Sequence, residues 1–108
     1  MSFQKSLNHL IQKKIYVFQQ IQLQIQIAQT NLATAKEAFK VNDAELISSK
    51  EYYRLTERRY REGQALQIEV VDARTQMTAA ELKRSLAQFT VLMRAIELER
   101  AEASYKLN

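Results

Sequence analysis

The chain has 108 residues, with a single glycine, no proline, no cysteine and no tryptophan, and its formal net charge is +4. The absence of cysteine excludes a disulfide and a thiolate metal site. The basic residues alternate with glutamate and do not form the basic stripe with interleaved aromatics that is typical of nucleic-acid binding, so no nucleic-acid partner is expected.

The composition favours an all-α fold. Good helix formers dominate the sequence, and one glycine without proline leaves few places where a helix can end. No run approaches the roughly 20 apolar residues that a membrane span needs. The first residues also lack the apolar region of a signal peptide. The chain taken alone would therefore remain in the cytosol.

A seven-residue repeat runs through the first half of the chain. A large row comprises Ile11, Phe18, Ile25, Leu32, Phe39, Leu46, Tyr53 and Tyr60. A small row starts at Ile21 and continues with Ala28, Ala35, Asn42, Ser49, Thr56 and Gly63. This spacing is typical of a coiled coil. It predicts one helix over about 8–62, with fraying expected in the first ten residues. Residues 21–27 alternate like a strand, but the heptad register continues through Ile25 and favours helix.

Gly63, the only glycine, predicts a turn at about 63–66, because glycine readily takes the left-handed conformation that ends many helices. Basic side chains crowd the end of the first helix, where cations are favoured: Arg58, Arg59 and Arg61. Glu69 and Asp72 lie in the opening turns of the second helix, where anions are favoured. Since residues 64–67 offer no capping side chain, this second helix, predicted over about 67–106, is expected to start raggedly.

Two apolar seams follow the turn. The first seam is Leu66, Val70, Ala73, Met77, Ala80, Arg84, Ala87, Val91, Arg94, Leu98, Ala101 and Tyr105. The second seam is Ile68, Asp72, Thr75, Ala79, Leu82, Leu86, Phe89, Met93, Ile96, Arg100, Ala103 and Leu107. The seams start two residues apart, which is about 200° around a helix. A hairpin needs only one of them. We therefore expect the second helix to pack between two neighbours, as in the wall of a tube.

No catalytic, cofactor or metal site is predicted. His9 is the only histidine and has no carboxylate at close helical spacing. The acidic residues form no convergent pair, and one glycine cannot make a phosphate-binding loop. Enzyme activity is therefore not expected.

The segment around the turn carries a family resemblance. It reads Tyr60-Arg-Glu-Gly63-Gln-Ala-Leu-Gln-Ile-Glu69-Val70-Val71-Asp72-Ala73, and alanines follow at positions 80 and 87. This string resembles the TolC family of outer-membrane efflux proteins, in which Tyr-x-x-Gly precedes Glu/Asp-Val-hydrophobic-Asp-Ala and alanines seven residues apart. The likeness covers roughly residues 20–105.

The resemblance implies one piece of an α-barrel wall: a periplasmic tunnel segment of a trimeric outer-membrane channel for efflux or type I secretion. Implied partners are two further copies, a periplasmic adaptor (membrane fusion) protein and an inner-membrane transporter. The chain would be one hairpin of a longer protein, located at the outer membrane and periplasm through strands that it lacks.

The turn would form the channel entrance where the adaptor docks. By position, the residues implied in that role are Tyr60, Gly63, Leu66, Glu69 and Asp72. Two positions depart from the family. Leu66 stands where many members have Ser or Thr, and Ala65 stands where some have a gating arginine.

A different class of function also fits the sequence. A generic antiparallel coiled-coil interaction module or scaffold explains the first seam, but it leaves the second seam without a role.

Overall fold

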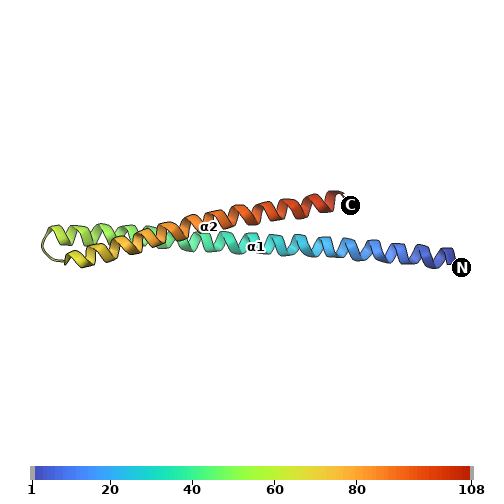
Figure 1. Cartoon of the computed structure of the whole chain (residues 1–108), viewed down its shortest axis with the longest axis horizontal. Coiled ribbons are helices and arrows are strands. Elements are labelled where there is room, and N and C mark those ends of the chain that lie inside the picture. The colour runs from blue at the N-terminus through green and yellow to red at the C-terminus, as the bar shows by residue number, and fades with distance from the viewer. Residues whose placement is uncertain (1, 108) are drawn as a thin grey trace. The chain divides into compact units, whose positions relative to one another are not determined.

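The computed structural model describes residues 2–107, which form two long α-helices, α1 (Ser2–Arg61) and α2 (Gln67–Leu107). The helices pack antiparallel as a hairpin (Figure 1). The predicted all-α coiled-coil hairpin is therefore confirmed. The start of α1 differs from the prediction, because the helix begins at Ser2 and not near residue 8. The alternating residues 21–27 are helical as expected.

The chain divides into two compact units. One comprises Thr34–Leu92 and contains the turn; we call it the turn unit. The other comprises Met1–Ala33 and Met93–Asn108; we call it the terminal unit. In each unit a segment of α1 packs on a segment of α2.

The core of the turn unit consists of small and medium side chains. Its buried residues are Ala35, Leu46, Thr56, Val70, Ala73 and Ala80. All come from the large row, the small row or the first seam. Ala73 is 0% exposed and Ala80 is 2% exposed, so the partner helix covers these methyl groups almost completely. Small side chains on both helices allow the two backbones to approach closely, and the larger residues of each helix then fill the space beside them.

Polar contacts between the helices explain how an arginine fits in the first seam. Arg84 Nε donates a 2.6 Å hydrogen bond to Asp43 Oδ1, and its guanidinium lies 5.2 Å from the centre of the Phe39 ring. Nearer the turn, Arg74 donates a 2.9 Å hydrogen bond to the Tyr53 hydroxyl. These contacts join positions far apart in sequence and hold one register between the helices.

The terminal unit is more thinly packed. Its buried residues are Ile21 and Ala28. The rings of Phe18 and Tyr105 lie 5.6 Å apart, centre to centre, at an interplanar angle of 45°. Every residue from 2 to 20 is exposed. Fewer apolar residues are therefore buried here than in the turn unit, although the large and small rows of α1 continue through this unit.

The close packing around Ala80 gives a direct test. Ala80→Leu adds three carbon atoms where there is no room, and we expect it to lower the free energy of unfolding by about 1–3 kcal/mol. Ala44→Leu, on the exposed side of α1, is the matched control and should change it by less than about 0.5 kcal/mol. Urea unfolding followed by circular dichroism measures both. Equal effects of the two substitutions would contradict a close-packed seam.

Candidate functional site

The turn is built as a specific helix-ending motif. Gly63 has a φ of 77°, in the left-handed region. The Gln64 N–H donates to the Arg59 carbonyl at 2.7 Å, and the Gly63 N–H donates to the Tyr60 carbonyl at 3.0 Å. This pair of hydrogen bonds defines a Schellman motif, which satisfies carbonyls at the end of the helix. The Arg59 guanidinium also donates to the Gln64 carbonyl at 3.3 Å. The predicted turn at Gly63 is thus an ordered structure.

The start of α2 is also ordered, contrary to the ragged start that the sequence predicts. Leu66 precedes the first helical residue and has no side-chain oxygen to cap the helix. The Glu69 carboxylate instead accepts a 3.1 Å hydrogen bond from the Leu66 N–H. This contact is one half of a capping box, in which the third helical residue reaches back to the residue before the helix. The negative charge of Glu69 is also favourable at this end of the helix dipole.

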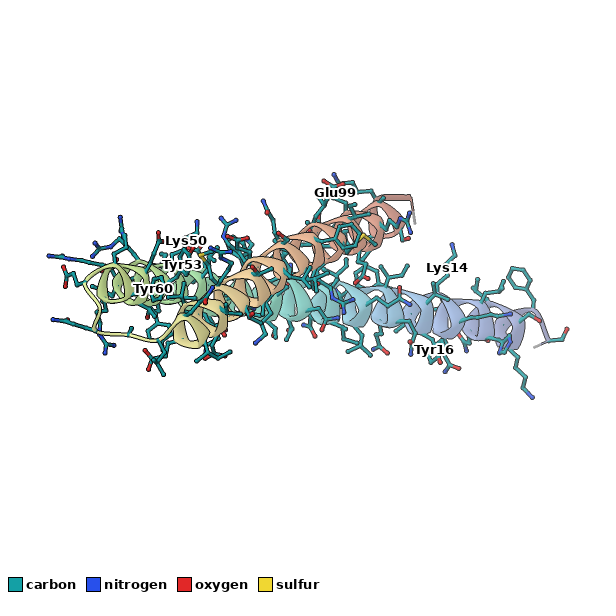
Figure 2. The ribbon with its side chains drawn as sticks, turned by 60° about the vertical axis from the view of Figure 1, so that its left-hand side comes forward. Lys14, Tyr16, Lys50, Tyr53, Tyr60 and Glu99 are labelled. Atoms are coloured by element: carbon teal, nitrogen blue, oxygen red, sulfur yellow. The ribbon has the colours of Figure 1, made fainter. Side chains whose placement is uncertain are left out.

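The five residues expected at the channel entrance lie together around the turn. Gly63 makes the turn, and Leu66 and Glu69 form the cap described above. Tyr60 is exposed in the last turn of α1 (Figure 2). Asp72 lies one turn into α2, where its carboxylate accepts a 3.1 Å hydrogen bond from the Gln76 amide.

A shallow groove of about 380 Å³ opens at the start of α2. It is lined by Ile68, Glu69, Val71, Asp72 and Thr75. Leu66 stands exposed just before it. The surface beside the turn therefore combines apolar side chains with two carboxylates, a chemistry suited to contact with another protein.

The second seam of α2 is exposed along the turn unit. Ile68, Leu82, Leu86 and Phe89 all keep more than half of their surface accessible. The first seam, on the other side of the same helix, is buried or half-buried from Val70 to Val91. The sequence predicts two packing faces on this helix, and α1 covers only one of them. Contiguous exposed apolar surface is typical of protein interaction sites.

Sequence reasoning missed a further set of exposed apolar residues on α1. Ile27, Val41 and Leu55 are all exposed and belong to neither row of that helix. They are fourteen residues apart, which places them on one face of a heptad-periodic helix. The fourteen-residue spacing could have revealed this set in the sequence. Because it includes only every second heptad, it is a weaker pattern than the large and small rows.

Two hydrogen-bonded contacts at the surface shift the pKa of a charged side chain. Arg54 donates hydrogen bonds of 2.6 and 3.1 Å to the two carboxylate oxygens of Glu51. These bonds lower the pKa of Glu51. The hydrogen bond to Tyr53 similarly raises the pKa of Arg74. The Glu51–Arg54 pair lies within α1, whereas the Arg74–Tyr53 contact joins the two helices; all four side chains are at the surface, and neither contact lies in an enclosed site.

Within residues 2–107, no group of three or more His, Cys, Asp or Glu side chains could hold a metal ion. The same residues contain no helix with both the length and the hydropathy of a membrane span. Comparison with protein-family models, with curated proteins and with solved structures finds no match.

The left-handed turn residue can be tested by substitution. Gly63→Ala places a Cβ on a backbone with positive φ, although nothing lies within 4 Å of that Cβ. We therefore expect a loss of about 1–2 kcal/mol in the free energy of unfolding from the backbone conformation alone. Gly63→Asn should lose less, because asparagine tolerates this conformation. Gln64→Ala serves as the control at a residue with negative φ. Unchanged stability of Gly63→Ala in urea titrations would exclude the left-handed turn.

Proposed function

We propose that this chain is a wall-forming hairpin: a periplasmic helical tunnel segment of a trimeric outer-membrane channel for efflux or type I secretion. In this proposal the second seam packs against a neighbouring hairpin, and the turn docks a periplasmic adaptor protein that connects to an inner-membrane transporter. The observation that carries the proposal is the exposed second seam of α2, on the helix face opposite the buried first seam. The TolC-like string from Tyr60 to Ala73 supports the same assignment.

The exposed second seam has enough apolar surface to drive lateral packing. Fully burying one Leu or Phe side chain contributes about 1.5–3 kcal/mol. Leu82, Leu86 and Phe89 lie on one face of α2, so a single neighbouring helix would cover all three. Association also loses translational and rotational freedom. A weak, concentration-dependent interaction is therefore expected between isolated chains, and a stronger one between hairpins joined in a longer protein.

The surface at the turn combines exposed apolar side chains with carboxylates, which fits docking of another protein. Leu66 and Ile68 are among the most exposed apolar residues of the turn unit, and the carboxylates of Glu69 and Asp72 lie beside them. Leu66 and Ala65 offer neither the hydroxyl nor the arginine that family members carry there. Contact with an adaptor would therefore rely on apolar burial flanked by negative charge.

A second candidate function is a generic antiparallel coiled-coil module or scaffold. One observation favours it: the turn unit has a buried core of its own, so the hairpin does not need a neighbour to bury its first seam. In this case the second seam would bind a single partner helix and would not form part of a tube.

The gene sequence on either side of the region that encodes residues 1–108 distinguishes between these two functions. The proposed channel requires strand-forming segments and a second Tyr-x-x-Gly hairpin in the same reading frame. Sequencing the gene in both directions from the region that encodes residues 1–108 tests this requirement. In-frame stop codons on both sides, without strands or a second hairpin, would contradict the channel and favour the coiled-coil module.

Lateral packing itself is tested by sedimentation equilibrium of the full chain. Leu86→Gln should weaken self-association by about tenfold or more, because each 1.4 kcal/mol of lost burial is a factor of ten. Leu92→Gln is the matched control: it makes the same change on the same helix, at 56% exposure compared with 57%, but outside the second seam. Equal weakening by both variants, or a wild-type chain that is monomeric at all concentrations, would refute packing through the second seam.

A further inference from the structure

One segment of α1 differs in composition from the rest of the chain. Residues 15–27 contain only aliphatic side chains, aromatic side chains and glutamine. No charged residue occurs between Lys14 and Lys36, and the segment contains neither glycine nor proline. High β-propensity, low net charge and the absence of proline are the features of sequences that stack as intermolecular β-sheets. The segment therefore has a second way to pack besides the helix that it forms in α1.

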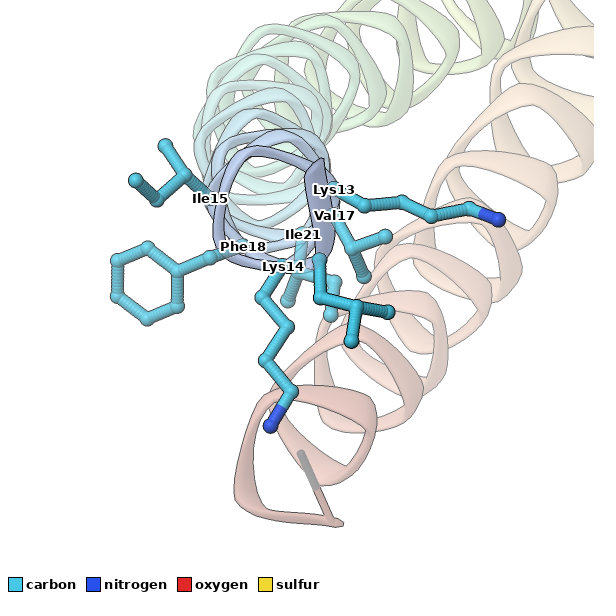
Figure 3. Close-up of a pocket in the computed structure, with 7 residues that line it drawn as sticks. Lys13, Lys14, Ile15, Val17, Phe18 and Ile21 are labelled. Atoms are coloured by element: carbon cyan, nitrogen blue, oxygen red, sulfur yellow. The ribbon is translucent and has the colours of Figure 1, made fainter. Parts of the chain in front are cut away.

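A helix cannot place the aliphatic side chains of this segment on one face. They are Ile15, Val17, Ile21, Leu23, Ile25 and Ile27. At about 100° per residue these six side chains are spread around the whole circumference. Figure 3 looks along α1 and shows Ile15 and Val17 projecting on different sides of the helix.

The seven residues from 21 to 27 show the consequence for burial. Ile21 is buried and Ile25 is half-buried, because both belong to the heptad rows that face α2. Leu23 and Ile27 lie on the other side of α1 and keep 49% and 51% of their surface exposed. The helical fold thus leaves half of the aliphatic residues in this stretch without a packing partner.

A strand would divide the same segment into two distinct faces. Successive side chains of a strand point to opposite faces, so the six aliphatic residues, which all have odd numbers, would share one face. The other face would carry Tyr16, Phe18 and the glutamines at 20, 22, 24 and 26. A β-sheet therefore offers this segment a continuous aliphatic surface that the helix does not provide.

The missing charge identifies the partner as a second copy of the same segment. In a parallel, in-register stack, each side chain lies beside its own copy in the next chain. A charged residue would then face a like charge, which is destabilising, and residues 15–35 contain none. Stacked glutamines form ladders that add to the stability of such sheets. Lys14 and Lys36 would repel their own copies, which confines the sheet to the region between them.

The conversion requires local opening of the terminal unit but not of the whole hairpin. Proteins open locally in cooperative units. The interhelical hydrogen bonds of Arg74 and Arg84 lie in the turn unit, so opening of the terminal unit leaves them in place. Among the six aliphatic residues of the segment, Ile21 is the one that opening would remove from a buried position.

We propose that residues 15–27 are a self-association site. When the terminal unit opens, this segment pairs with the same segment of other copies in a parallel, in-register β-sheet. The aliphatic faces of two such sheets form a dry interface, and the glutamines stack on the other face. This inference does not depend on the proposed function, because it uses neither the second seam nor the turn.

Prolonged incubation of the full chain just below its thermal unfolding transition tests the proposal. Thioflavin T fluorescence and infrared spectroscopy should show conversion from helix to intermolecular β-sheet. Diffraction from the product should contain the reflection at about 4.7 Å that is due to the spacing between strands. Hydrogen exchange should show protected backbone amides at residues 15–27.

A matched pair of substitutions separates β-pairing from packing of intact helices. Ile27→Lys places an ammonium group in the dry interface and should lengthen the time to half-conversion by at least about tenfold. Val41→Lys makes the same kind of change at another exposed position on the same face of α1, but outside the segment, and should leave this time nearly unchanged. Circular dichroism of fresh solutions checks that both variants keep the helical fold.

Three outcomes would overturn the proposal. The first is a wild-type chain that stays helical throughout the incubation. The second is equal slowing by Ile27→Lys and Val41→Lys, which would assign the association to the helix face that both residues share. The third is hydrogen-exchange protection in the product that falls outside residues 15–27, which would place the sheet in another part of the chain.

Discussion

The close approach of two helices through small side chains is the constraint on which the rest of the structure depends. Ala73 and Ala80 of α2 are almost completely covered, and Ala35 and Thr56 of α1 are buried on the facing helix. Such an approach aligns one face of each helix along its partner and fixes the register, which Arg84–Asp43 and Arg74–Tyr53 also maintain. A two-helix arrangement can satisfy only one such face per helix. Apolar residues on any other face remain at the surface.

One uncovered surface of the turn unit follows from this constraint. The second seam of α2 combines Leu82, Leu86 and Phe89 with few charges, which suits lateral packing against another helix.

The sequence was sufficient to predict the hairpin, the position of Gly63 and the first seam, because heptad spacing and a single helix breaker act locally. It was not sufficient where the hydrogen-bonding partner of a group comes from an unexpected position in the chain. Residues 64–67 lack a capping side chain, but the carboxylate of Glu69, in the first turn of α2, accepts a hydrogen bond from the Leu66 N–H and so caps the helix. Arg84 interrupts the first seam in sequence, but Asp43 on the facing helix pairs with it. Heptad spacing also shows that the second seam is apolar, but it carries no information about what covers it. The channel entrance at Tyr60, Leu66 and Asp72 remains a prediction for the same reason.

The central claim is that α1 covers the first seam while the second seam stays free to bind. A spin label on a single introduced cysteine measures this directly, since the chain contains no other cysteine. A label at Leu86→Cys should be mobile in dilute solution and become immobilised as the protein concentration rises. Immobilisation at the highest dilution would show that the second seam is already covered within one chain. A label that stays mobile while the chain associates would show that association uses another face, and either result would contradict the account.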